Sequence, residues 1–254
     1  MKVYLAGAGI WHWVLPRVQT RGIPSKFPFN ILMSFAVPDD IVVENIHKFQ
    51  DFILDSGAFS YLAGLDASKV DWDDYIRRYA SFINKYDIEK FIELDIDPIV
   101  GYERVKELRE KLIKLTGKKP IPVWHKSRGK DEFIKMCKEF PYVAIGGIVT
   151  KEITRKEYKF FPWFIQTAHQ YGAKIHALGL TNISAIKKYN FDSVDSSSWT
   201  CGNRFGYVVK FNGSELVQIK AGNSRRLKNA DAVAKHNFDE WVRFANHIEG
   251  GGAY

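Results

Sequence analysis

This chain alternates repeatedly between short apolar runs and amphipathic helical segments, and this alternation limits the folds that it can adopt. Short apolar runs separated by helical patterns are typical of buried parallel strands that are covered by helices. Eight such strand–helix units predict an α/β fold, a (β/α)8 barrel (TIM barrel) over about residues 1–200. The expected strands are residues 3–6, 31–36, 52–55, 91–95, 121–125, 142–146, 174–179 and 191–195.

The helical segments between these runs have clear signals. Residues 71–86 predict a helix with acidic residues at its N-terminal end, where the helix dipole favours negative charge. Its apolar stripe consists of Tyr75, Ile76, Tyr79, Phe82, Ile83 and Tyr86. Further helices are expected at residues 102–115, 130–139, 154–171 and 182–189, whereas the segment 7–30 resembles a loop.

An open, doubly wound parallel sheet is the rival fold. Its usual signal is a glycine-rich turn after the first strand. The only candidate here, Gly7-Ala8-Gly9, lacks the third glycine, and a lone pair of glycines is a weak signal. The pattern therefore favours the barrel.

After the eighth strand the pattern changes. Residues 206–220 predict a β-hairpin with Asn212-Gly213 as a two-residue turn. A basic connection then leads to a closing helix with Phe238, Trp241 and Ile248 on one face. We expect a single domain over residues 1–254, in which the hairpin and the closing helix occupy about residues 201–250.

The composition excludes several classes of protein. No run of eighteen apolar residues is present, so a membrane-spanning helix is not expected. Cys137 and Cys201 are too few for a disulfide framework or a cysteine metal site. The apolar stretch near the N-terminus is interrupted by glycines and His12, which favours a strand over a signal peptide. The sequence predicts a cytoplasmic protein without a metal.

The charge points to a polyanionic partner. The net charge is +8, and residues 104–130 contain ten Lys or Arg against two Glu. A basic surface of this kind favours nucleic acid. A solvated helix face with scattered lysines is the other interpretation of the same residues.

Polar residues follow several of the predicted strands. Asp55, Asp95, His125 and Asp195 stand at strand ends, where barrel enzymes carry their active sites. Each acid alone could be a helix N-cap or a loop acceptor. Several carboxylates at one mouth would be pushed apart in pKa, which gives one proton donor and one base or nucleophile. That arrangement suits cleavage of a glycosidic bond.

Five motifs resemble those of the tRNA-guanine transglycosylases, which replace guanine in a nucleic acid by a 7-deazaguanine. They occur in the same order, over about residues 50–220: "LDSGAFS", "LDIDP", "IGGIV", "HALGL" and "SVDSSSW". The resemblance implies that Asp195 is the nucleophile at C1′ and that Asp55 is the general acid and base.

The resemblance also implies a base pocket. Asp95 would bind the purine edge, and the backbone of Gly146 and Gly147 would approach the flat base. Ser56 and Gly57 leave room for a planar base beside Asp55. No cofactor is implied, because one glycosidic bond is exchanged for another.

The sequence also departs from the family pattern at several positions. Ala58 and Ser60 replace a glycine and a glutamine, and "VWHKSRG" replaces a Gln-Gly segment, so His125 could take over base recognition. A histidine bonded to the backbone of the core is the other interpretation of His125. The zinc subdomain of the family is absent. A compact chain without zinc looks more like the phage and bacterial branch that inserts 7-deazaguanines, such as 7-cyano-7-deazaguanine, into DNA.

The predicted partners are DNA and the incoming base, with an accessory protein possible. Base exchange on tRNA, a nucleic-acid N-glycosidase and a non-catalytic nucleic-acid-binding relative are the alternatives. Tryptophans near strand ends could stack on bases: Trp11, Trp13, Trp124 and Trp199. Cations expected along the phosphates are Lys126, Arg128, Arg204, Arg225 and Arg226.

Overall fold

The computed structural model describes residues 1–7, 11–12, 14–15, 27–220 and 229–250, with the side chains of residues 203 and 204 excepted. The chain divides into two compact units. Unit 1 contains residues 1–32, 39–51 and 179–254, and unit 2 contains residues 33–38 and 52–178. This division into units does not test the expected single domain over residues 1–254, which stays a prediction.

Unit 1 combines strands from both ends of the chain with a hairpin and a long helix. Its elements are β1 (Lys2–Ala6), most of β2 (Phe27–Ser34), α2 (Asp40–Val43), η1 (Ile46–Lys48), the start of β3 (Phe49–Asp55), α9 (Ile183–Lys188), β7 (Ser193–Ser196), η4 (Ser198–Cys201), α10 (Gly202–Phe205), β8 (Tyr207–Phe211), β9 (Leu216–Lys220) and α11 (Ala230–Ile248).

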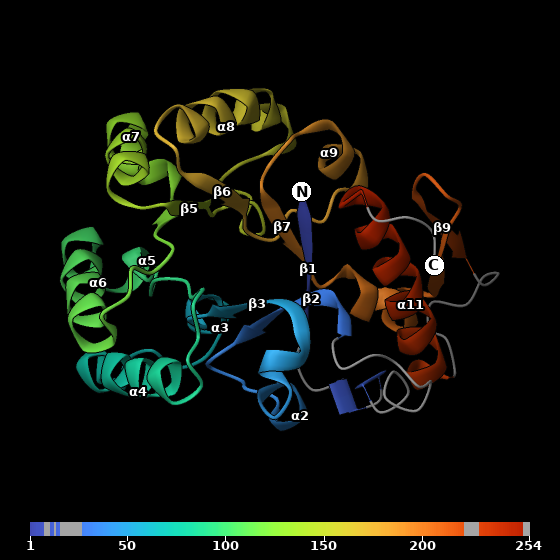
Figure 1. The fold of residues 1–254 in the computed structure, drawn as a ribbon, viewed down its shortest axis with the longest axis horizontal. Helices are drawn as coiled ribbons and strands as arrows, with labels where there is room; N and C mark the ends of the chain where they lie inside the picture. Colours follow the sequence, from blue (N-terminus) through green and yellow to red (C-terminus); the bar gives the residue numbers. More distant parts are fainter. Residues whose placement is uncertain (8–10, 13, 16–26, 221–228, 251–254) are drawn as a thin grey trace. The chain divides into compact units, whose positions relative to one another are not determined.

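Unit 2 contains the middle of the chain. Its elements are the end of β3, α3 (Ala58–Leu62), α4 (Trp72–Lys85), α5 (Asp97–Val100), α6 (Tyr102–Thr116), β4 (Val123–Trp124), η2 (Lys126–Arg128), α7 (Gly129–Glu139), β5 (Tyr142–Ile145), η3 (Arg155–Phe160), α8 (Phe161–Gln170) and β6 (Lys174–Ala177). Figure 1 shows α4 beside α6 and α7 beside α8.

The strands of the main sheet are parallel and follow the order β3-β2-β1-β7-β6-β5-β4. In unit 1, Tyr4 of β1 lies opposite Asn30 of β2 and Asp195 of β7. In unit 2, Ala144 of β5 lies opposite Val123 of β4 and His176 of β6. An α/β fold on a seven-stranded parallel sheet is therefore confirmed, and it is compatible with a barrel-like arrangement. The closed (β/α)8 barrel stays a prediction.

The expected fourth strand, residues 91–95, is much shorter than predicted. Phe91 bridges Leu54, and Ile92 bridges Ile121, as isolated pairs. The pairing stops there because a side chain takes over: Glu93 Oε1 accepts the N–H of Val123 at 2.8 Å.

The amphipathic helices follow the predicted spacing closely. Four residues of the predicted stripe on α4 are buried, Tyr75, Ile76, Tyr79 and Ile83, whereas Phe82 and Tyr86 are half-buried. The Asp71 carboxylate caps the helix by accepting the N–H groups of Asp73 and Asp74. The segment 154–171 is not one helix. It forms η3 and then α8, with Pro162 in the first turn of α8, where a missing N–H costs no helical hydrogen bond.

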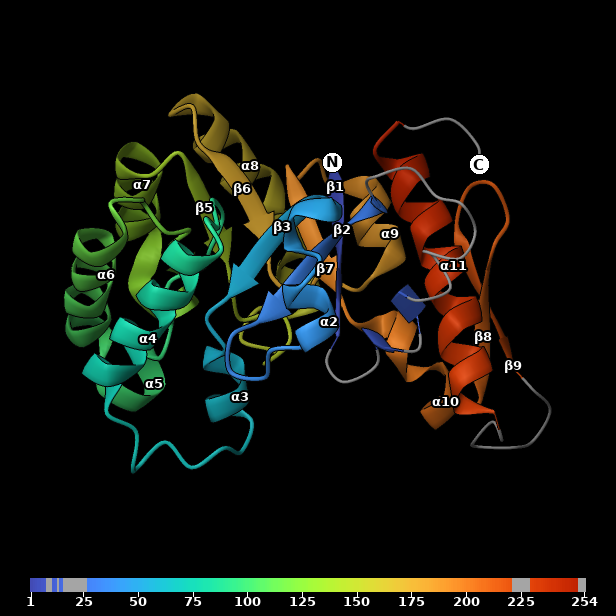
Figure 2. The ribbon, with the colours of Figure 1, turned by 60° about the horizontal axis from the view of Figure 1, so that its bottom comes forward.

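The C-terminal hairpin and closing helix are confirmed, and α11 runs along the hairpin in Figure 2. The predicted two-residue turn is wrong. Phe211 pairs with Leu216, so the loop spans residues 212–215. The Asn212 carboxamide oxygen accepts the N–H groups of Ser214 and Glu215, and Gly213 has φ +94°. This side-chain bonding stabilises a longer loop.

Candidate active site

The carboxyl ends of the unit 2 strands carry most of the predicted site residues. Asp55 ends β3, Asp95 follows the short bridged segment, His125 follows β4 and Gly146 follows β5. Parallel strands end at a common edge of the sheet, which is where ligands bind in α/β proteins. The structure therefore brings these four residues to one edge of unit 2.

Asp55 lies in a tight turn. Its Oδ2 accepts the Gly57 N–H at 2.9 Å, and its backbone carbonyl accepts the Phe35 N–H at 2.8 Å. Gly57 has φ +85°, and a Cβ there would stand 2.4 Å from the Ala36 Cβ. Ser56 is fully buried. The backbone packing of the turn therefore requires a glycine, and the Asp55 carboxylate serves as a loop acceptor in addition to any chemical role.

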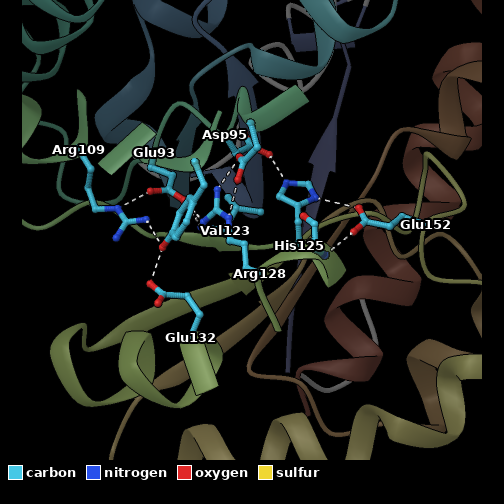
Figure 3. Close-up of polar contacts among 11 residues, drawn as sticks. Glu93, Asp95, Arg109, Val123, His125, Arg128, Glu132 and Glu152 are labelled. Carbon is cyan, nitrogen blue, oxygen red and sulfur yellow. Dashed lines mark hydrogen bonds and ion pairs between the residues drawn. The ribbon is translucent and has the colours of Figure 1, made fainter. Parts of the chain in front are cut away.

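Asp95, His125 and Glu152 form one connected cluster (Figure 3). His125 Nε2 lies 3.1 Å from Asp95 Oδ2, and His125 Nδ1 lies 3.1 Å from Glu152 Oε2. The side chains of Asp95 and His125 are 13% exposed, and that of Glu152 is 29% exposed. The alternative of a histidine bonded to core backbone is not what the structure shows, because both ring nitrogens face carboxylates.

The electrostatics of this cluster differ from those of free side chains. Burial alone would lower the pKa of His125, but the hydrogen bond and charge of Asp95, together with Glu152, outweigh it and raise that pKa to about 9. Burial raises the pKa of Asp95, and the hydrogen bond from His125 opposes that rise. His125 is therefore a cation at neutral pH.

Gly146 and Gly147 are required by these side chains. A Cβ on Gly146 would stand 2.7 Å from the His125 Cε1, and one on Gly147 would stand 2.7 Å from Glu152 Oε2. Gly147 also has φ +79°. The absence of side chains was expected to admit a flat base. In the structure it admits the His125 ring and the Glu152 carboxylate.

Glu152 was missed in the sequence, although it is central to the geometry. It lies in the loop between β5 and η3, where Ile153 N–H donates to the Gly147 carbonyl at 3.0 Å. Its Oε1 also accepts the Ser127 N–H at 3.3 Å. No periodicity marks a loop residue of this kind, so only its position six residues after Gly146 could have drawn attention to it.

Asp195 belongs to unit 1. It lies on β7 opposite Tyr4, it is 8% exposed, and its Oδ1 accepts the Gly179 N–H at 2.7 Å. The motifs "HALGL" and "SVDSSSW" thus meet at this hydrogen bond. The prediction that Asp195 shares one mouth with Asp55 and Asp95 stays a prediction.

A second buried cluster surrounds Glu93, beside Asp95 in the sequence. The Glu93 carboxylate accepts from Arg109, from Arg128 and from the Val123 N–H. Arg128 also donates Nε and Nη2 to the two oxygens of Asp97, at 2.8 and 2.6 Å, and its guanidinium stands 4.1 Å from the centre of the Tyr102 ring. This network joins α5, α6, η2 and the end of the bridged segment.

The predicted phosphate-binding cations separate into three groups. Lys126 is exposed and pairs with Glu157 at 2.5 Å. The Arg128 side chain is 1% exposed and saturated by carboxylates, so this geometry does not support its predicted phosphate contact. Arg225 and Arg226, and the side chain of Arg204, lie outside the described residues.

The tryptophans are core residues where the structure describes them. Trp11 and Trp199 pack against each other and against Phe238, and their indole N–H groups donate to the Gly7 and Ala6 carbonyls. Trp124 is 5% exposed and donates to the Gly129 carbonyl. The predicted base-stacking role is not supported for these three, and Trp13 lies outside the described residues. Phe59, which follows the Asp55 turn, is 51% exposed.

Within the described part of the chain, no group of His, Cys, Asp and Glu side chains converges to hold a metal ion. His125 points its two nitrogens in opposite directions, so the Asp95–His125–Glu152 cluster cannot converge on one ion. Among the helices that the structure describes, none combines the length and apolar character needed to cross a membrane.

Comparison of the sequence with protein-family models and with curated proteins gives no match. The resemblance to the tRNA-guanine transglycosylases therefore rests on the short motifs, on their order and on their positions at strand ends.

Proposed function

We propose that this protein is a transglycosylase that exchanges guanine in a polynucleotide, DNA in the first place, for a 7-deazaguanine base such as 7-cyano-7-deazaguanine. The observation that carries the proposal is the edge of unit 2. There Asp95 and His125 meet in direct contact, with Gly146 packed on the imidazole and Asp55 at the end of β3. A carboxylate acceptor and a cation at the ends of parallel strands suit recognition of a polar, planar base.

The proposed reaction has two balanced steps. The Asp195 carboxylate attacks C1′, the C1′–N9 bond breaks, and the departing guanine takes a proton from Asp55. The incoming base then loses its N9 proton to Asp55 and attacks C1′, which releases Asp195. One glycosidic bond replaces another, so the reaction needs no redox partner and no nucleoside triphosphate.

The local geometry supports these roles in part. The Gly179 N–H holds one oxygen of Asp195, and the Gly57 N–H holds one oxygen of Asp55. A backbone hydrogen bond of this kind restricts the orientation of a carboxylate, and positioning is a large part of catalysis.

We also propose that the strands close into a (β/α)8 barrel. The support is the pair of bridges in unit 2: Phe91 bonds to β3 on one side, and Ile92 pairs with Ile121, just before β4, on the other. The bridged segment then serves as the eighth strand, between the first and last strands of the sheet order.

The polymer is DNA in this proposal, the reaction takes place in the cytoplasm, and tRNA is the alternative. The net charge of +8 and the exposed Lys126 support a polyanionic partner. The target base must leave its stack before it can reach carboxylates at a sheet edge, which costs a few kcal/mol.

The decisive experiment supplies the protein with duplex DNA, single-stranded DNA or tRNA, each with 7-cyano-7-deazaguanine. Mass spectrometry of the digested polymer then shows which polymer acquires the modified base. Release of free guanine without an added base would indicate an N-glycosidase. If no polymer gains the base and no covalent adduct forms at Asp195, the transglycosylase proposal is wrong. Polymer binding by the wild type without any turnover, left unchanged by Asp195→Ala, would indicate a non-catalytic binding protein.

A further inference from the structure

The contacts of His125 favour its protonated form on geometric grounds. Its two ring nitrogens lie 3.1 Å from Asp95 Oδ2 and 3.1 Å from Glu152 Oε2. An ionised carboxylate only accepts hydrogen bonds, and neutral imidazole has a single N–H. With both carboxylates ionised, only the doubly protonated ring donates in both directions, so the imidazolium makes both contacts hydrogen bonds.

The ring has little freedom to leave this position. Gly146 and Val123 lie against it, since a Cβ on Gly146 would stand 2.7 Å from His125 Cε1 and 2.9 Å from Val123 Cγ1. On the far side, Glu152 is held by the Ser127 N–H and rests on Gly147. The contacts therefore run from the loop after β5, through the imidazole, to Asp95 (Figure 3).

We propose that Glu152 is a positioning residue that holds His125 as an imidazolium, and that this cation keeps the buried Asp95 carboxylate ionised and aimed at the base. An ionised carboxylate can accept both the N1–H and the amino group of a guanine or 7-deazaguanine, whereas adenine offers no such pair of donors. The inference rests on the proposed function and deepens it, because it assigns base selection to three connected residues, Asp95, His125 and Glu152, which we call the relay.

The surroundings decide how the relay responds to pH. The charged and titratable groups that face it are Glu93, Arg128 and Tyr79, besides Glu152 itself. Arg128 opposes the charge on His125, and Glu93 opposes the charge on Asp95. Without the imidazolium, burial would favour the neutral acid at Asp95, which donates a hydrogen bond where the base needs an acceptor.

The first test measures the charge of His125 without any substrate. The imidazole of the whole protein is followed by NMR from pH 5 to 10, with His125→Asn to assign the signal. In the wild type we expect protonation to persist to about pH 9. In Glu152→Gln the midpoint falls by about one pH unit. A wild-type midpoint at the ordinary histidine value, or a midpoint unmoved by Glu152→Gln, overturns the proposal.

The second test measures binding of 7-cyano-7-deazaguanine and of 7-deazaadenine as free bases across the same pH range. We expect only the guanine-type base to bind, with an alkaline limit that falls with the His125 midpoint in Glu152→Gln. The affinity of this variant should be roughly twofold weaker than that of the wild type at pH 8 and roughly tenfold weaker at pH 10, where the ratio of the protonated fractions of His125 is largest. Glu110→Gln, on the exposed face of α6, is the matched control and should follow the wild type. Equal binding of both bases, or a pH limit that does not move with His125, overturns the proposal.

Folding and function are separated by two further measurements. Thermal unfolding at pH 6 shows whether Glu152→Gln is folded, and Asp95→Asn provides a second variant that should lose base binding at every pH while lowering the His125 midpoint. If His125 titrates near pH 9 but no purine binds and none is exchanged, the proposed function fails, and the role of Asp95 toward the base fails with it.

Discussion

At the level of single residues, the position of an acid at a strand end does not determine which partners its carboxylate has. Asp55 and Asp195 each accept a backbone N–H from a neighbouring loop glycine, Gly57 and Gly179. Asp95 instead meets an imidazole. The same residue type at similar positions thus has two different kinds of partner, and these partners determine which carboxylate is anchored by the backbone and which belongs to a charged relay.

Asp195→Asn should abolish base exchange if Asp195 is the nucleophile. The amide keeps the size of the side chain and its acceptor for the Gly179 N–H, but it cannot form the glycosyl ester. We expect a fall of roughly 10³-fold or more in the exchange rate, with binding of the free base retained. Trapping of the covalent adduct by denaturing gel and mass spectrometry checks this. Asp231→Asn, an exposed residue at the start of α11, is the control, and near-normal exchange by Asp195→Asn would contradict the assignment.

Gly146→Ala should disturb the relay directly, because the new methyl group would stand 2.7 Å from the His125 ring. Overpacking of this kind costs about 1–3 kcal/mol. We expect a displaced His125 signal in the NMR titration and weaker base binding. Gly117→Ala is the comparison: its Cβ meets open space, so its φ of +68° costs stability while the His125 titration stays unchanged. An unaltered His125 midpoint in Gly146→Ala would contradict the packing described.

At the scale of elements, the buried carboxylates of Glu93 and Asp97 tie several segments of unit 2 together. Arg128 comes from η2, Arg109 from α6 and Asp97 from α5, and Glu93 replaces a backbone partner of β4. Burial opposes the charge on Arg128, but Glu93 and Asp97 outweigh it and raise the pKa of the guanidinium. A buried ion pair stabilises the protein only when its geometry is good, and the loss of one partner leaves the charge of the other buried and uncompensated.

Arg128→Met should therefore destabilise the protein strongly. Removal of this cation leaves Asp97 without its bidentate partner and Glu93 with Arg109 as its remaining cation, and a cost of about 3–5 kcal/mol is expected. Urea unfolding followed by tryptophan fluorescence measures it. Lys135→Met, on the exposed face of α7, should change the free energy of unfolding by about 0.5 kcal/mol or less. Equal stability of the two variants would show that the buried network contributes little.

Element prediction succeeded where the spacing of apolar residues decides the structure. The apolar stripe and the acidic residues at its N-terminal end predicted α4 to within one residue at each end. The strand expected at 91–95 failed because Glu93, read as part of a strand, pairs through its side chain. The helix expected at 154–171 failed because Pro162 begins a new helix. The periodicity of apolar residues does not show where a side chain replaces a backbone partner or where a proline begins a new helix.

On the scale of the whole molecule, charge should govern polymer binding. Lys126 is exposed and paired with Glu157, whereas Arg128 is buried. Lys126→Ala should lower the slope of log affinity against log salt by about 0.9 for duplex DNA, if Lys126 neutralises one phosphate. Fluorescence anisotropy between 50 and 200 mM salt checks the slope. Lys135→Ala is the control, and an unchanged slope for Lys126→Ala would remove this lysine from the interface.

The pH dependence of stability follows from the same relay. The pKa of His125 rises from its ordinary 6.5 to about 9 on folding. The corresponding stabilisation, about 3 kcal/mol, is fully present below pH 6.5 and is lost as pH rises through about 9. The difference in unfolding free energy between wild type and His125→Asn should shrink over that window. A difference that is constant from pH 6 to 10 would show that His125 is not charged by its neighbours.

Four features could be predicted from the amino-acid sequence: the alternation of strands and helices, the helical stripes, the hairpin with its closing helix, and the position of acids at strand ends. These features depend on spacings within a few residues, where backbone geometry and burial act locally. The burial of Arg128 among carboxylates and the contact of Glu152 with His125 depend instead on how distant segments pack together. Those partners are separated by 27–35 residues in the chain, and strand register together with loop path brings them together. Local periodicity carries no information on either.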